Sequence, residues 1–259
     1  MLVNNIFGYG CSHARNAIPH DTKPLKLAYS EKGCWIELLQ TKHELCSRAH
    51  NRAMEGSDNW RIFHRVMKTI SSDKIKENDL IIIQWSYLSR KTWWPDNSVE
   101  AFYKNSWDEI PHNIMLTFDH LGVWEDKLKT KTEQVGELYY QHIYNEVESY
   151  VNMLSQTVLI SKWAKSNNVK LLVTGVETQE VYENIERKHF ALLGNNVFTK
   201  LEEYFNIENQ TPLQYIYKEY SDEPIAAIDN GGTLNMHLNT YGNEIQSDII
   251  SDIIRKRFA

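Results

Sequence analysis

The chain has 259 residues and a formal net charge of −6 at pH 7. Apolar residues make up 42% and charged residues 24% of the sequence, which is typical of a folded globular protein and excludes a disordered chain. The negative charge argues against a general nucleic-acid-binding protein. The sequence contains no run of 18 apolar residues, so no membrane-spanning helix is predicted. From the charge and this pattern we expect neither nucleic acid nor a membrane as a partner.

Cysteine and histidine spacing bears on compartment and metal binding. Cys11, Cys34 and Cys46 form no Cys-x-x-Cys pair, which indicates free thiols in a reducing compartment. The N-terminus lacks the pattern of a signal peptide. The ten histidines include no His-Glu-x-x-His motif. We therefore expect a cytoplasmic protein with no metal and no cofactor.

The first segment of interest runs from an apolar lead at residues 2–7 into Gly8, Gly10 and then Ser12. This pattern predicts a buried strand that ends in a tight turn and presents Ser12 at the carboxyl edge of a sheet, where ligands bind in open α/β folds. A serine in that place can be a nucleophile if a histidine reaches it. The alternative is that Ser12 only caps a following helix. The neighbouring Cys11 is expected to pack inward.

The next elements alternate helices with loops. Residues 13–33 predict a loop, and residues 34–39 predict a short amphipathic helix. Apolar residues then recur at helical spacing from Ile62 to Ile70, and residues 57–59 contain the expected N-cap. Gly56 lies in the loop before this helix, where backbone N–H groups can face an anion, although a plain turn glycine fits equally well.

The middle of the chain contains the clearest strand. Residues 79–85 include four consecutive aliphatic side chains, which suit a strand covered on both faces. A helix over 137–167 and a strand over 169–175 form half of a βαβ unit, which predicts a parallel sheet. Between them, the aromatic-rich residues 91–131 predict an insertion over the sheet edge that either lines a cleft or forms a satellite core. One domain over residues 1–259 with this insertion fits best.

The C-terminal part predicts a short strand or loop at 225–228, a turn at 229–232, and a terminal helix after Gly242. His237 stands just before that helix. Because loops at the carboxyl ends of parallel strands converge on one edge, Ser12 and His237 can meet despite their separation in the chain.

Four short sequence motifs, which we call blocks one to four, follow one another along the chain: Gly10-Cys11-Ser12, Gly56 with Ser57 to Asn59, the strand ending at Gln84-Trp85, and His237 to Gly242. Together they resemble the SGNH (GDSL-type) hydrolase family. The resemblance implies a three-layer α/β/α sandwich of the flavodoxin-like kind that cleaves carboxylic esters, often acyl or acetyl groups on carbohydrates, lipids or small molecules. It further implies Ser12 as nucleophile, His237 as general base, and the backbone N–H groups of Ser12 and Gly56 as oxyanion donors, with Asn59 in the same block.

Two positions depart from the family pattern. Where the family has an aspartate before the histidine, this chain has Asn235, which can accept a hydrogen bond from the imidazole but carries no charge to stabilise the imidazolium. Where the family has Gly-x-Asn-Asp, this chain has no asparagine, and Gln84, Ser86 or Ser89 could supply the missing donor.

Three functions are therefore compared. The first is a serine hydrolase that acts on a small-molecule or carbohydrate ester. The second is a binding or structural module on the same fold whose catalytic residues have been lost, with tryptophans of the insertion stacking on sugars. The third is a nucleotide-binding domain, for which the lone Gly8-x-Gly10 is weak evidence. The sequence does not indicate an oligomeric state.

Overall fold

A parallel sheet forms the centre of the protein. The computed structural model describes residues 1–15, 33–54, 57–93, 116–119, 122–123, 142–194, 196–221, 225–228 and 234–259. Its central strands lie in the order β2 (Arg48–Asn51), β1 (Asn5–Tyr9), β3 (Leu80–Trp85) and β7 (Lys170–Gly175), all parallel. Residues 203–205 run alongside β7, because Val173 donates to the Glu203 carbonyl at 2.9 Å and accepts from the Phe205 N–H at 3.0 Å. If β7 is counted as the fourth strand and residues 203–205 as the fifth, the order is 2-1-3-4-5. This is the flavodoxin-like order, which confirms the predicted fold class.

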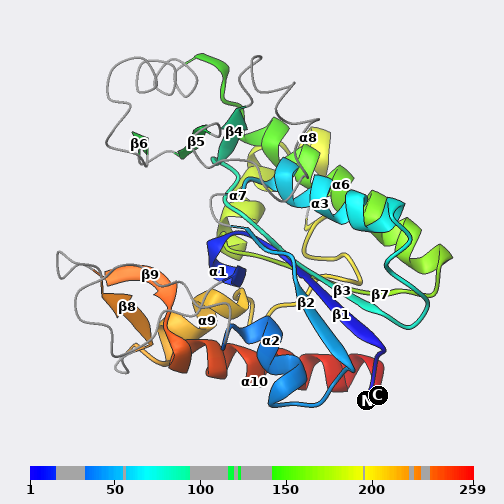
Figure 1. Ribbon diagram of the computed structural model, residues 1–259. Coiled ribbons are helices and arrows are strands. Elements are labelled where there is room, and N and C mark those ends of the chain that lie inside the picture. Colours follow the sequence, from blue (N-terminus) through cyan, green and yellow to red (C-terminus); the bar gives the residue numbers. More distant parts are fainter. Residues whose placement is uncertain are drawn as a thin grey trace.

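Helices cover both faces of this sheet, as Figure 1 shows. On one face lie α3 (Asn59–Ser71) and α6 (Glu146–Ser166), and on the other lie α2 (Trp35–Thr41) and α10 (Thr240–Phe258). The strand β3 explains this arrangement, since Ile81 and Ile83 pack into the α3–α6 core while Leu80 and Ile82 pack into the α2–α10 core. Its four consecutive aliphatic residues are fully buried, as the sequence predicted.

The remaining helices and strands lie around the sandwich. The helices are α1 (Ser12–Arg15), α7 (Gln179–Lys188), α8 (Phe190–Leu193) and α9 (Pro212–Glu219). The strands form two small antiparallel groups, β4 (Lys91–Trp93) with β5 (Leu116–Asp119) and β6 (Gly122–Val123), and β8 (Ala226–Ile228) with β9 (Leu234–Leu238). The first group lies within the predicted insertion at 91–131, whose other residues are outside the described part of the chain.

Several element boundaries correct the sequence prediction. Of the helix predicted over 137–167, residues 137–141 lie outside the described part of the chain. The helix α6 begins at Glu146, where the side chain of Asn145 caps it by accepting the Glu148 N–H at 3.1 Å. The first strand extends to Tyr9, and α1 begins at Ser12, where a loop was predicted from residue 13. The short polar strand β2 was not predicted at all. The cap predicted within residues 57–59 is confirmed as Asp58, which accepts the Arg61 N–H at 2.9 Å.

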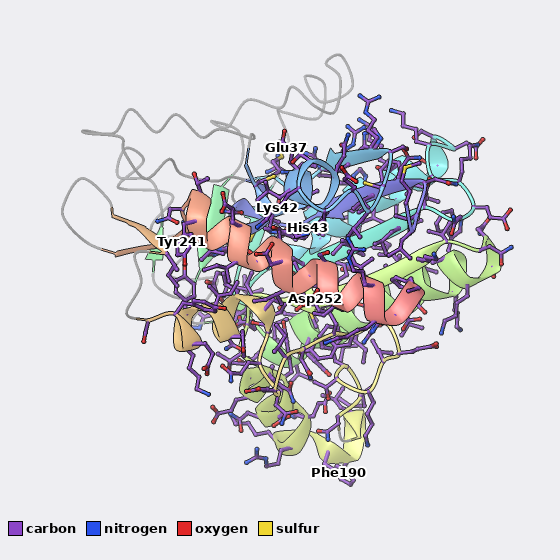
Figure 2. The ribbon with its side chains drawn as sticks, turned by 90° about the horizontal axis from the view of Figure 1, so that it is seen from below. Glu37, Lys42, His43, Phe190, Tyr241 and Asp252 are labelled. Atoms are coloured by element: carbon purple, nitrogen blue, oxygen red, sulfur yellow. The ribbon has the colours of Figure 1, made fainter. Side chains whose placement is uncertain are left out.

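Polar contacts fix α10 against α2. The Asn243 side chain accepts the backbone N–H of Trp35 at 3.0 Å, and Asp248 pairs with Lys42 and His43 at 2.6 and 3.0 Å. Figure 2 shows α10 lying across this face with Lys42 and His43, the two residues that follow α2, beside it. The start of α10, and with it the strand that carries His237, is thereby held against the sheet.

Gly242 permits a close approach at the start of α10. Asn239 caps the helix by accepting the Gly242 N–H at 2.9 Å. A Cβ atom on Gly242 would lie 2.6 Å from the carbonyl oxygen of Ile225 and 2.9 Å from a methyl carbon of Leu238. The glycine of the His237 block therefore lets the helix pack directly behind β9.

We expect Gly242→Ala to lower the free energy of unfolding by about 1–3 kcal/mol, because the backbone carbonyl of Ile225 has to move. Helix propensity alone predicts the opposite sign, a gain of up to about 1 kcal/mol. Urea unfolding followed by circular dichroism decides between them. Asp252→Ala, on the exposed side of α10 (labelled in Figure 2), is the matched control and is expected to change little. Unchanged or raised stability of Gly242→Ala would contradict the close approach.

Candidate functional site

The carboxyl end of β1 meets the carboxyl end of β3 at very short range. A Cβ atom on Gly10 would lie 2.7 Å from the Cβ atom of Ala14 and 3.2 Å from the carbonyl oxygen of Gln84. No side chain other than hydrogen fits there, so the chain can turn directly from β1 into α1. Ser12 is the first residue of α1, and its side chain lies outside the described part of the chain.

Backbone hydrogen bonds bring the second block to the same turn. The N–H of Arg52 donates to the Gly8 carbonyl at 2.7 Å, and the N–H of Met54 donates to the Gly10 carbonyl at 3.0 Å. The segment that leads to Gly56 therefore runs beside the β1–α1 turn. Gly56 itself lies outside the described residues, so its predicted role as an oxyanion donor stays a prediction.

Asn59 joins the second block to the third. Its side-chain oxygen Oδ1 accepts the backbone N–H of Ser86 at 2.7 Å, which leaves the amide NH₂ group to donate elsewhere. The hydroxyl of Ser86 accepts a hydrogen bond from Nη1 of Arg90 at 3.2 Å. Of the three candidate donors in the third block, Ser86 is thus engaged with Arg90, and Ser89 is buried.

Gln84 has a different environment. It lies on the same face of β3 as Leu80 and Ile82, which pack into the α2–α10 core, and its side chain is fully buried. Neither its amide nitrogen nor its amide oxygen has a hydrogen-bond partner within the described chain. Its predicted role as an oxyanion donor remains a prediction.

His237 lies in β9 and stacks on His13, the residue after Ser12. The two ring centroids are 4.5 Å apart and the ring planes differ by 9°. The helix α1 contacts β9, and it lies at the end of β1 in Figure 1. Two residues from opposite ends of the sequence therefore meet at the carboxyl edge of the sheet. Asn235 lies two residues earlier in β9, and its side chain is outside the described part.

Tyr87 and Arg90 extend this pair of histidines. The hydroxyl of Tyr87 lies 3.5 Å from Nε2 of His13, and the guanidinium carbon of Arg90 lies 5.4 Å from the centre of the Tyr87 ring. The Nδ1 atom of His13 has no hydrogen-bond partner among the described residues. His237, His13, Tyr87 and Arg90 thus form one contiguous group, which we call the His–Arg cluster.

Burial and positive charge keep both histidines neutral. Burial, together with the Arg90 charge, lowers the pKa of His237 to about 4. Burial is also the main reason that the pKa of His13 lies well below its usual value, and His237 and Arg90 lower it further. A neutral imidazole is the form that can accept a proton. His237 is therefore in the form a general base requires at any pH above about 5.

Three members of the His–Arg cluster were not predicted as site residues. His13 fell in a predicted loop. Arg90 stood among the functional-looking side chains after the strand at 79–85 but received no role, and Tyr87 received none either. One signal in the sequence could have found Arg90: it is the one charged residue among residues 80–90, most of which are apolar. The stacking of His13 on His237 has no local sequence signal, because it joins the two ends of the chain.

No protein-family model and no curated protein sequence matches the chain. Among solved structures, it is similar to a psychrotrophic esterase from a Pseudoalteromonas species, with 11% identity and a TM-score of 0.45 over 98% of this chain and 97% of the other. A member of the lipolytic G-D-S-L family from Veillonella parvula has 9% identity and a TM-score of 0.47, with 97% and 98% covered. An acetyl xylan esterase from Geobacillus stearothermophilus has 13% identity and a TM-score of 0.45, with 100% and 98% covered.

Of these three structures, the one from Veillonella parvula is named for the G-D-S-L family, which the sequence motifs resemble. Within the described residues, no group of three or more His, Cys, Asp or Glu side chains could hold a metal ion. In the same part of the chain, no helix is long and apolar enough to cross a membrane.

Proposed function

We propose that this protein is a divergent SGNH-type serine hydrolase that cleaves a carboxylic ester of a small molecule or carbohydrate. The observation that carries the proposal is the stacking of His237 on His13, directly after Ser12 in the chain, at the carboxyl edge of a flavodoxin-like sheet. That edge is where ligands bind in this class of fold. A serine and a neutral histidine there are the minimum that nucleophilic ester cleavage requires.

In the proposed reaction, the Ser12 hydroxyl attacks the ester carbonyl while His237 accepts its proton. His237 then gives the proton to the departing alcohol, and a water molecule hydrolyses the acyl-serine in the same manner. The backbone N–H groups of Ser12 and Gly56 would stabilise the oxyanion, each contributing on the order of 3 kcal/mol. The free NH₂ group of Asn59, fixed through Ser86, is a candidate for the third donor.

Asn235 replaces the acidic residue of the triad in this proposal. An asparagine oxygen can accept the N–H of the imidazole and hold one tautomer, as in Cys-His-Asn sites. It does not offset the positive charge that forms on the ring during reaction. Burial and the Arg90 charge lower the pKa of His237 to about 4, and Asn235 brings no negative charge that would raise it.

The test is hydrolysis of p-nitrophenyl acetate and butyrate by the wild type and by Ser12→Ala. We expect Ser12→Ala to lower kcat by about 10⁴-fold or more. Ser71→Ala, at the exposed end of α3, is the matched control and is expected to retain full activity. Incubation with an organophosphonate should add one phosphonyl group to Ser12 in the wild type, read by peptide mass spectrometry. Equal background rates together with an unlabelled Ser12 would overturn the proposal and favour a binding module on the same fold.

A further inference from the structure

A cavity of about 340 Å³ opens next to the His–Arg cluster. It lies between the start of α3, the segment after β3, and α6. The start of α3 contributes Asp58 and Asn59 to its lining, the segment after β3 contributes Leu88 and Arg90, and α6 contributes Gln156. Asn59 and Arg90 both hold Ser86, so the cavity borders the third block of the proposed active site. Its volume suits part of a small-molecule substrate.

Arg90 brings a buried positive charge to this cavity. Only 8% of the residue is exposed. Its Nη1 atom donates to the Ser86 hydroxyl at 3.2 Å, its Nε atom has no hydrogen-bond partner in the described chain, and its guanidinium lies over the Tyr87 ring. None of its contacts within the described residues is an ion pair with a carboxylate.

The acidic residue that lines the cavity does not substitute for such a partner. Asp58 is committed to capping α3, since its Oδ1 atom accepts the Arg61 N–H at 2.9 Å. Burial of a guanidinium without an anion is costly because the charge loses its hydration. A bound anion would remove that cost and would fill the vacant Nε–H donor, a geometry in which arginine is favoured over lysine.

The cavity also contains an acceptor without a donor. The side-chain oxygen of Gln156 is buried and has no hydrogen-bond partner among the described residues. A ligand that fits both groups has an anionic oxygen for Arg90 and a hydroxyl or N–H group for Gln156.

We propose that Arg90 binds a negatively charged group of the substrate, so that the enzyme prefers esters with a carboxylate or another oxyanion a few atoms from the scissile bond. This inference rests on the proposed hydrolase function and narrows its substrate class. Arg90 then serves as the specificity-determining residue of the site. The remaining cavity wall, which includes Leu88 and Met153, receives the carbon chain between the two groups.

The experiment compares two p-nitrophenyl esters of equal acyl length, the neutral valerate and the monoanionic glutarate. At pH 8 we expect the wild type to show a higher kcat/KM for the glutarate. Arg90→Gln should lower the ratio of the two kcat/KM values by about 10- to 100-fold, which is the size of a charge-assisted hydrogen bond. Arg90→Lys should give an intermediate ratio. Arg187→Gln, on the exposed surface of α7, is the matched control and should leave the ratio unchanged.

The ratio separates binding of the anion from a purely structural role, because an Arg90 that only holds the site would lower both kcat/KM values equally. An unchanged ratio in Arg90→Gln would overturn the proposal and leave the hydrolase function standing. If the site accepts any oxyanion, inorganic phosphate should inhibit glutarate hydrolysis by the wild type but not by Arg90→Gln. If the site requires a carboxylate, monomethyl glutarate should inhibit the wild type and phosphate should not.

A binding measurement keeps the two proposals distinguishable. Monomethyl glutarate should raise the Tm of Ser12→Ala but not that of the double variant with Arg90→Gln. If neither ester is hydrolysed and this shift still depends on Arg90, the hydrolase function fails while the anion site stands. If monomethyl glutarate and phosphate shift neither variant, the anion site is refuted.

Discussion

His237→Gln is expected to lower kcat for ester hydrolysis by about 10⁴-fold or more, the cost of removing the general base of a serine hydrolase. Glutamine keeps a polar side chain of similar reach in β9 but cannot accept a proton near neutral pH. The measurement is kcat and kcat/KM over pH 4–9 with a p-nitrophenyl ester. Because the pKa of His237 is about 4, the wild-type kcat/KM should already be near its plateau at pH 6, below the range of an ordinary histidine.

His13→Gln is the control that identifies which of the two stacked rings is the base. A stacked ring pair contributes about 0.5–1.5 kcal/mol, which corresponds to at most about a tenfold change in rate. We therefore expect His13→Gln to cost no more than that. A loss as large as that of His237→Gln would contradict the assignment of His237 alone and would make the pair the functional unit.

Much of the architecture follows from local patterns in the sequence. The aliphatic run of β3 predicts a strand covered on both faces, and apolar spacing with an N-cap within residues 57–59 predicts α3. These features are local, because burial of a continuous apolar strand and satisfaction of the first N–H groups of a helix need only neighbouring residues. The short polar strand β2 escaped prediction because it lies at the sheet edge, where one ladder of hydrogen bonds with β1 suffices and burial is slight.

Only part of the site could be predicted from the sequence, because sequence patterns report local features and not contacts between distant segments. Ser12 and His237 stand out through the motifs around them. The roles of His13, Tyr87 and Arg90 depend on contacts between segments that are distant in the chain, such as the stacking of His13 on His237. Gln84 looks like Ser86 and Ser89 in the sequence, yet the alternation of side chains along β3 places it on the same face of the strand as Leu80 and Ile82, where its amide has no hydrogen-bond partner among the described residues.

Arg90 connects substrate choice to the strength of the base. Its positive charge disfavours protonation of His237 and His13, which weakens His237 as a proton acceptor. An anionic substrate group next to Arg90 would cancel part of that charge and would raise the proton affinity of His237 when substrate is bound. An asparagine at position 235 could then suffice where the family has an aspartate, because the substrate would supply the missing negative charge.

The same buried histidines are expected to make the protein sensitive to mild acid. The pKa of His237 is about 4 in the folded chain and about 6.5 in an unfolded one, so between these values the unfolded state binds more protons and the free energy of unfolding falls as the pH falls. The stabilisation is complete above pH 6.5 and is lost as the pH falls through 4. From pH 7.5 to pH 5, His237 alone accounts for a loss of about 2 kcal/mol.

Urea unfolding at pH 7.5 and pH 5 measures this loss in the wild type and in His237→Gln. We expect the stability of the variant to fall by about 2 kcal/mol less than that of the wild type, since glutamine does not titrate. Both proteins should still lose some stability in acid, because the pKa values of three other histidines are also lowered. These are His13, His50 and His64. An equal loss in the two proteins would mean that His237 titrates as it does in the unfolded chain, which would contradict its burial beside Arg90.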